Sequence, residues 1–196
     1  MPNTTPYSCS YSRVVELYTN CGVISVELYD DESHCVAESF YRLAASGQLD
    51  GVVVSRLIPS FVIEFSVAGH PVFGEWMDVD VCNSLHHTGA GIVSCPRRGL
   101  EAGSFFITLG PQPFLDEACI IFGRVYSGMR VVQNISQLSV SAETFHLFSP
   151  VVIERCNVRL LPRAERPTSL LPQRLNNGAS KPLNRRRTKS VLDSLE

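Results

Sequence analysis

The sequence predicts a mainly β domain, built as a barrel or a sandwich with two α-helices. Short apolar and β-branched runs recur from residue 14 to residue 160, and Gly, Pro or Asn turn signals separate them. Only two segments have the spacing of an amphipathic helix. With so few helices, the strands must bury one another's apolar faces, and in a barrel the helices would plug the open ends.

The first elements are a hairpin and a helix. Residues 14–19 and 23–29 flank the turn signal Asn20-Cys21-Gly22, and the second run alternates apolar and polar residues, which predicts an antiparallel hairpin. A helix is predicted next, with Gly47 at its C-terminal end. Its N-cap candidates are Asp30, Asp31 and Ser33, and its apolar face consists of Val36, Phe40, Leu43 and Ala44.

The remainder of the domain reads as further short strands and one more helix. Strands are expected over residues 51–58, 61–67, 91–95, 105–109, 120–126 and 151–160. The second helix is expected over residues 127–138 with Ser127 as its cap, and its inward side chains are Met129, Val132 and Ile135.

The chain divides into three regions. Residues 1–12 are expected to be a disordered lead-in, residues 13–160 the folded domain, and residues 161–196 a basic, Pro-rich tail that is disordered unless bound to a partner. The tail has eight Lys or Arg and three Asp or Glu, so its net charge is +5, and the rest of the chain carries −7. The tail therefore suits either an acidic partner in a larger protein assembly or simple solvation.

Composition narrows the classes of function. The seven cysteines are odd in number and include no CxxC pair, so we expect neither a metal site nor a cofactor. The N-terminus lacks the apolar segment of a signal peptide and no run is long enough to cross a membrane, which predicts an intracellular, cytoplasmic or nuclear, protein. Nucleic-acid binding is disfavoured, because it would rest only on Arg97, Arg98 and the basic cluster 185–189.

Three stretches resemble the cyclophilin family in order and spacing. Residues 55–64, Ser-Arg-Leu-Ile-Pro-Ser-Phe-Val-Ile-Glu, resemble Phe-His-Arg, four residues, Phe-Met-x-Gln. Residues 87–91, His-Thr-Gly-Ala-Gly, and 103–107, Gly-Ser-Phe-Phe-Ile, are similar to His-Thr-Gly-x-Gly and Ser-Gln-Phe-Phe. Residues 114–116, Phe-Leu-Asp, and 121–125, Ile-Phe-Gly-Arg-Val, are similar to Trp-Leu-Asp and Val-Phe-Gly-x-Val. Gly74-Glu75 also falls where the family has Tyr-Gly-Glu.

The resemblance spans residues 14–158 and implies a closed eight-stranded antiparallel β-barrel capped by two α-helices. It also implies peptidyl-prolyl cis-trans isomerase activity on proline-containing polypeptides. Rotation about an X-Pro bond needs a grip on the proline ring and a hydrogen-bond donor for a nitrogen that loses its resonance. By the resemblance, Arg56 is that catalytic cation, and the proline pocket is lined by Phe61, Val62, Phe106 and Leu115. Phe105 and Phe106 are adjacent on one strand, so one faces the barrel interior and the other faces out. The resemblance implies that Phe106 is the outward one.

Several positions depart from the family pattern. Glu64 and Ser104 replace two glutamines, Phe114 replaces a tryptophan and Cys119 replaces a histidine, and all four are kept as substrate-binding candidates. The carboxylate of Glu64 could pair with Arg56 and occupy the donors that catalysis needs. Where the family has an Ala-Asn-Ala backbone clamp, this chain reads Pro96-Arg97-Arg98, and the loop of residues 99–103 is short.

Two functions from different classes fit these residues. The first is a peptidyl-prolyl cis-trans isomerase of weakened activity, which acts on or binds X-Pro segments. The second is a catalytically inactive subunit that uses the same fold as an interaction module in a larger assembly. The retained apolar residues and Arg56 favour the first, whereas the replaced polar residues favour the second.

Overall fold

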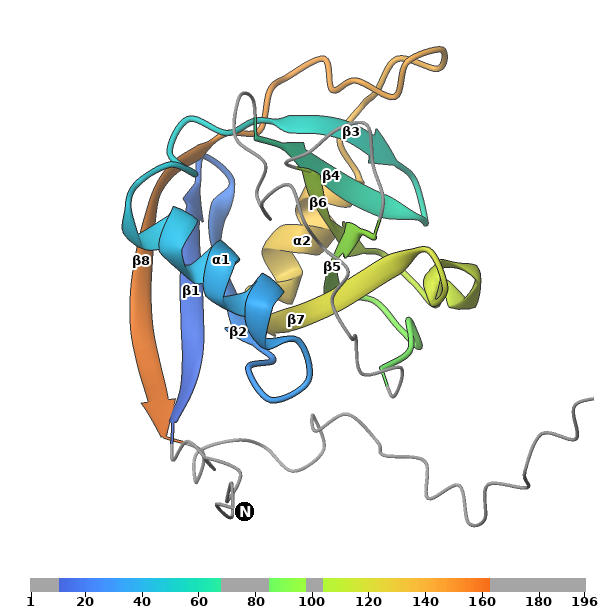
Figure 1. Cartoon of the computed structure of the whole chain (residues 1–196). Helices are drawn as coiled ribbons and strands as arrows, with labels where there is room; N and C mark the ends of the chain where they lie inside the picture. Colours follow the sequence, from blue (N-terminus) through green and yellow to red (C-terminus); the bar gives the residue numbers. More distant parts are fainter. Residues whose placement is uncertain (1–10, 68–84, 98–103, 163–196) are drawn as a thin grey trace, which may run out of the picture.

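The computed structural model describes residues 11–67, 85–97 and 104–162, which form one β-sheet domain with two α-helices (Figure 1). The lead-in up to residue 10, the Gly74-Glu75 motif, Arg98, the loop of residues 99–103 and the tail from residue 163 lie outside the described residues. In chain order the elements are β1 (Tyr11–Thr19), β2 (Gly22–Leu28), α1 (His34–Ala45), β3 (Val54–Ile58), β4 (Val62–Ser66), β5 (Ile92–Pro96), β6 (Ser104–Thr108), the short 3-10 helix η1 (Pro113–Leu115), β7 (Cys119–Ser127), α2 (Met129–Ser136) and β8 (Ile153–Pro162).

The eight strands form a single sheet in the order β3-β4-β6-β5-β7-β2-β1-β8, and every neighbouring pair is antiparallel. The sheet curls until its two edges meet. There, just before β3 and β8, Val53 and Val152 form an isolated antiparallel bridge. The Val54 N–H donates to the Val151 carbonyl oxygen at 2.9 Å, and the Ile153 N–H donates to the Val52 carbonyl oxygen at 2.8 Å. The predicted mainly β, eight-stranded antiparallel fold with two helices is confirmed, and a short bridge links its edges.

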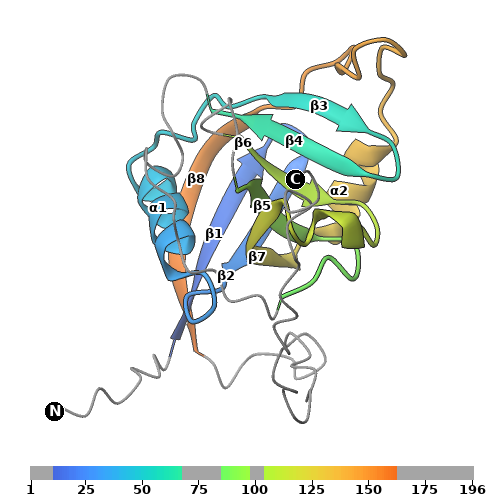
Figure 2. The ribbon, with the colours of Figure 1, turned by 45° about the vertical axis from the view of Figure 1, so that its right-hand side comes forward.

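The interior of the curled sheet is filled by aromatic and branched side chains. Phe105 stacks on Phe65 with ring centroids 4.8 Å apart, and the ring of Phe40 meets it edge-on at 5.0 Å. Phe40 comes from α1, so this helix contributes directly to the core. The two helices lie on opposite sides of the curled sheet, as Figure 2 shows, and each buries its apolar face there. Within the described residues, neither helix has the length or the apolar character needed to cross a membrane.

The ends of several elements differ from the sequence prediction. β1 begins at Tyr11 and β8 continues to Pro162, because these two residues pair with each other in the sheet. Residues 11 and 12 of the predicted lead-in and residues 161 and 162 of the predicted tail therefore belong to the sheet. The predicted cap Ser127 is wrong, since it ends β7 and the N-cap of α2 is Gly128. Ser33 is the N-cap of α1, but its hydroxyl donates to the Ile121 carbonyl oxygen at 2.6 Å.

Gly128 makes the turn from β7 into α2 in a conformation that other residues rarely adopt. Its φ is +94°, and a Cβ atom there would lie 2.3 Å from the Val23 carbonyl oxygen of β2. Both features depend on the absence of a side chain. The tight approach fixes the start of α2 against the β1–β2 hairpin.

We expect Gly128→Ala to lower the free energy of unfolding by at least ~2 kcal/mol, because the strained φ and the backbone clash act together. Gly89→Ala is the matched control, since nothing lies within 4 Å of a Cβ atom there. Urea denaturation followed by circular dichroism measures both changes. Equal, small losses in the two variants would contradict the role of Gly128.

Candidate functional site

The site lies on the outer face of the sheet, where four side chains form one cross-strand row. Arg56 of β3 is opposite Glu64 of β4, Glu64 is opposite Phe106 of β6, and Phe106 is opposite Ser94 of β5. Directly opposed residues in antiparallel strands project to the same face. The interior side chain of Phe105 alternates with Phe106, so this row faces away from the core. The predicted orientation of Phe106 is confirmed.

The sequence-predicted apolar residues gather on this face in a cluster separate from the core, here named the outer cluster. Its buried members are Val62, Phe106 and Cys119, and the partly buried residues packed against them are Ile58, Phe61 and Leu115. They come from β3, β4, β6, β7, η1 and the turn between β3 and β4. The structure therefore brings together all four residues predicted to line a proline site. Ile58 also belongs to this cluster, and no motif in the sequence singled it out.

Phe114 stands at the rim of the outer cluster. This residue is 66% exposed, and its ring stacks on that of Phe61 with centroids 5.5 Å apart. The short helix η1 puts Phe114 and Leu115 side by side, with Leu115 packed into the cluster. Phe114 thus offers an exposed aromatic surface next to partly buried apolar side chains. Ser104, two residues before Phe106 on β6, is buried.

Arg56 and Glu64 form an ion pair beside the outer cluster. The Nε atom of Arg56 donates to Oε2 of Glu64 at 2.7 Å. The side chain of Glu64 is only 12% exposed, whereas that of Arg56 is 48% exposed. The pairing anticipated from the sequence is therefore present. It leaves about half of the arginine surface accessible while directing its Nε donor at a carboxylate.

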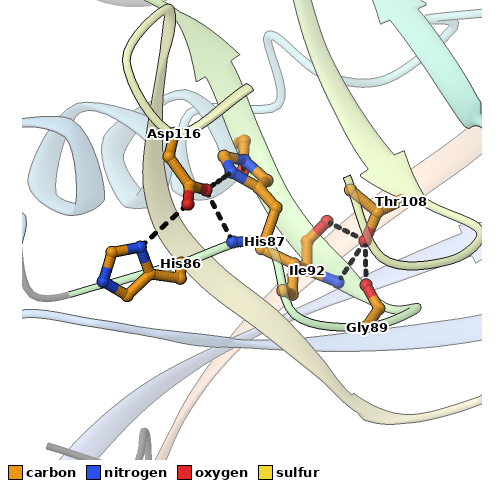
Figure 3. Close-up of polar contacts among 7 residues, drawn as sticks. His86, His87, Gly89, Ile92, Thr108 and Asp116 are labelled. Atoms are coloured by element: carbon orange, nitrogen blue, oxygen red, sulfur yellow. Dashed lines mark hydrogen bonds and ion pairs between the residues drawn. The ribbon is translucent and has the colours of Figure 1, made fainter. Parts of the chain in front are cut away.

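His87 begins the His-Thr-Gly-Ala-Gly motif, from which no role of its own is predicted. Figure 3 shows its polar contact with Asp116. His87 is buried, and its Nδ1 atom is 2.7 Å from Oδ1 of Asp116, while its Nε2 atom is 2.9 Å from the hydroxyl of Ser94. Its backbone N–H also donates to Oδ1 of Asp116 at 2.8 Å. The ring of His87 lies 6.4 Å from that of Phe106 in a stacked arrangement. His87 therefore helps to fix both Ser94 and Phe106 of the cross-strand row.

The ionisation of this network follows from its contacts. Burial lowers the pKa of His87 and outweighs the hydrogen bond and charge of Asp116, which raise it. Burial alone would raise the pKa of Asp116, but hydrogen bonds from His87 and His86 lower it below its usual value. His86 supplies the second imidazole, with Nδ1 2.8 Å from Oδ2 of Asp116. Since an ionised carboxylate only accepts hydrogen bonds, neutral His87 carries its proton on Nδ1 and accepts from Ser94 through Nε2.

Thr108 holds the turn that connects His87 to β5. Its hydroxyl donates to the Gly89 carbonyl oxygen at 2.8 Å and accepts from the Ile92 N–H at 3.0 Å (Figure 3). Thr108 is fully buried at the end of β6. The turn is thereby fastened to the same strand that carries Phe106, so His87 and Phe106 are held relative to each other.

The segment that corresponds to the family's backbone clamp begins at the end of β5. Pro96 is opposite Cys119 of β7, and the Arg97 N–H donates to the Ala118 carbonyl oxygen at 2.8 Å. Burial raises the pKa of the Cys119 thiol to about 11, although the charge of Arg97 opposes the increase. Cys119 is therefore a protonated packing residue of the outer cluster at neutral pH.

Within the three described ranges, no group of His, Cys, Asp or Glu residues is arranged to hold a metal ion. The cysteines recorded there as free thiols are Cys21, Cys35, Cys95, Cys119 and Cys156. The outer cluster and the Arg56–Glu64 pair offer apolar contact, charge and hydrogen bonds.

The chain belongs to the cyclophilin-type peptidyl-prolyl cis-trans isomerase family. The sequence model described as "Cyclophilin type peptidyl-prolyl cis-trans isomerase/CLD" matches residues 14–158. This family acts on proline-containing peptides.

Individual relatives agree with this assignment. The chain is 42% identical over 129 residues to peptidyl-prolyl cis-trans isomerase ppi1 of Schizosaccharomyces pombe, an alignment that covers 62% of this chain and 83% of that protein. It is 36% identical over 137 residues to peptidyl-prolyl cis-trans isomerase cypE of Dictyostelium discoideum, covering 66% of this chain and 88% of that protein. The crystal structure of a cyclophilin-type isomerase from Cryptosporidium parvum has the same fold, with a TM-score of 0.69, 21% identity, and coverage of 76% of this chain and 98% of that one.

The lowered pKa of His87 predicts a pH dependence of stability. The unfolded chain binds a proton at this residue as the pH falls below 6.5, whereas the folded state does not until a lower pH. The stabilising contribution is thus complete above pH 6.5 and is lost as the pH falls from there toward the folded pKa. The slope attributable to one proton is at most about 1.4 kcal/mol per pH unit.

We expect His87→Gln to flatten the fall in unfolding free energy between pH 7.5 and 5.5, as measured by urea denaturation. His146→Gln is the control, because His146 is exposed in the loop before β8 and should leave the slope unchanged. A slope in His87→Gln equal to that of the wild-type protein would show that folding does not lower the pKa of His87.

Proposed function

We propose that this protein is a peptidyl-prolyl cis-trans isomerase of weakened activity, in which Arg56 is the catalytic cation and the outer cluster holds the proline ring. The observation that carries the proposal is the position of Arg56, half-exposed and in the same cross-strand row as Phe106. Family membership and the gathering of Phe61, Val62, Phe106 and Leu115 support it. Phe114 at the rim is proposed to contact residues that flank the proline.

The chemistry requires binding more than bond making. The barrier to X-Pro rotation is about 20 kcal/mol and arises from the resonance of the amide. In the transition state the nitrogen becomes pyramidal and gains a lone pair, so a fixed donor lowers its energy. A proline ring packed on Phe106 and Val62 would be held while the preceding carbonyl group turns. Arg56 would then donate to the prolyl nitrogen.

Weakened activity follows from Glu64. Its carboxylate holds the Nε atom of Arg56 at 2.7 Å, so that donor must be released or shared before it can serve the substrate. The family glutamine that Glu64 replaces is neutral and would not bind a guanidinium so strongly. Loss of one charge-assisted hydrogen bond in the transition state costs about 1.5–3 kcal/mol, which is roughly a 10- to 100-fold loss of rate.

The direct test is X-Pro exchange on a short Ala-Pro-containing peptide, measured by NMR with the full-length chain. The choice of peptide is supported by the related Cryptosporidium parvum isomerase, whose structure was also determined in the presence of the dipeptide Ala-Pro. Exchange faster than in the free peptide, and lost in Arg56→Ala, is the expected result. Exchange at the uncatalysed rate in the wild-type protein would refute the proposed activity.

Glu64→Gln is expected to raise the rate of catalysed exchange by about tenfold, because the neutral amide releases the Nε donor of Arg56. Glu38→Gln is the matched control. Glu38 pairs with Arg13 and Arg42 on and near α1, so its removal should leave exchange unchanged. A Glu64→Gln variant no faster than the wild-type protein would show that the ion pair does not limit activity.

The second candidate is an inactive interaction module of a larger assembly. The buried, short Ser104 and the substituted segment at Pro96 and Arg97 favour it, because both change groups that would hold the peptide backbone. The predicted tail, which after residue 162 still carries a net charge of +5, would dock on an acidic partner inside the cell. Peptide binding without exchange in either the wild-type protein or Glu64→Gln would favour this candidate.

A further inference from the structure

Arg97 lies at the β5–β7 end of the outer cluster. Its N–H donates to the Ala118 carbonyl oxygen, and the preceding residue, Pro96, is opposite Cys119, a buried member of the cluster. Burial raises the pKa of the Cys119 thiol, and the positive charge of Arg97 acts in the opposite direction, so this charge reaches the outer cluster. Arg56 comes from β3 and Arg97 from the end of β5, so the two cations flank the strands that carry Val62 and Phe106.

The two arginines differ in how their charge is satisfied. Arg56 is paired with Glu64. In the described part of the chain Arg97 forms no ion pair, and its Nε atom is buried without a hydrogen-bond partner. The only other side-chain nitrogen or oxygen in that condition there is the hydroxyl of Ser12, which is uncharged. A buried donor left unsatisfied costs about 1–3 kcal/mol, and more on a charged group, so such a donor calls for an explanation.

We infer that Arg97 recognises an anionic group, a carboxylate or a phosphate, on a residue that flanks the proline of the bound polypeptide. The guanidinium presents a planar fork of donors that matches the paired oxygens of either anion. Arg56 does not compete for this anionic group, because the carboxylate of Glu64 already neutralises the charge of Arg56. This inference rests on the proposed function, since it places the proline on the outer cluster and its neighbour near Cys119.

The inference predicts which polypeptides the outer cluster prefers to bind. Polypeptides with Glu, Asp or a phosphorylated Ser or Thr next to proline would be preferred over those with neutral or basic neighbours. The anion would pair with the guanidinium of Arg97, which is partly exposed, and would partly replace the backbone clamp that Pro96 cannot provide. Selectivity of this electrostatic kind weakens as the salt concentration rises.

The test compares affinities of matched peptides for the full-length chain by NMR titration. In one series the residue before proline is Gln, Glu or phosphoserine, and in a second series the same three residues follow the proline. In at least one series, the Glu or phosphoserine peptide should bind about tenfold more tightly than the Gln peptide. Arg97→Gln should reduce that ratio to about one, and Arg97→Lys should retain part of it. Arg130→Gln, which removes an exposed arginine from α2, should leave the ratio unchanged.

The outcomes separate this inference from the proposed function. If the Gln, Glu and phosphoserine peptides bind with equal affinity in both series, the role of Arg97 is refuted and the proposed proline site is not. A preference for anions that survives Arg97→Gln also overturns it, because another cation then reads the anion. Failure of every peptide to bind overturns both proposals. Preference for phosphoserine alone supports the inference with phosphate as the source, and preference for both anions supports it with either source. A further outcome is that Arg97→Gln reduces the affinity for a single-stranded oligonucleotide while the peptides show no preference. In that case Arg97 binds nucleic acid and the inference fails.

Discussion

The site depends on the alternation of side chains along β6. Because Phe105 and Phe106 are neighbours on one strand, the first must enter the core and the second must face outward. Phe105 is held inside by stacking on Phe65 and by contact with Phe40 of α1. A core packed in this way fixes the register of β6 against β4, and that register sets Glu64 opposite Phe106. The packing of the interior therefore determines the geometry of the outer cluster.

Charge distinguishes this site from one built only on apolar contact. Glu64 neutralises Arg56 at one side of the outer cluster, whereas Arg97 at the other side has no carboxylate partner among the described residues. The two substitutions have opposite consequences for a bound polypeptide. In the proposed function, Glu64 withdraws a donor from the reacting nitrogen and so would weaken catalysis. Arg97 would add an attraction for an anionic neighbour. If both proposals hold, the site would bind anionic proline-containing polypeptides more tightly and isomerise them more slowly.

Much of this arrangement could be predicted from the sequence because it depends on local alternation. Alternation shows that Phe105 and Phe106 face opposite ways. The family resemblance implies that Phe106 faces out and lies near Phe61, Val62 and Leu115. The Arg56–Glu64 pair is anticipated from the charge of Glu64 within the matching segment. His87 could not be assigned a role in the same way, since its partner Asp116 is 29 residues distant and the two meet only when the chain before β5 packs against the turn after η1. Glu27 alternates as a polar strand residue, yet it is fully buried against Arg124, 97 residues later. A charged residue such as Glu27 can be buried only when a partner satisfies it. The local periodicity of the sequence does not identify a partner that is distant along the chain.

The central claim is that the outer cluster is the surface on which proline binds, and NMR titration of the full-length chain with an Ala-Pro-containing peptide tests it most directly. Phe105 serves as an internal reference, because its ring lies on the core side of the same strand. The account predicts that signals of the Val62 methyl groups and the Phe106 ring shift with added peptide, and that those of the Phe105 ring shift far less. Shifts centred on another face of the domain, or no shifts at any peptide concentration, would contradict it.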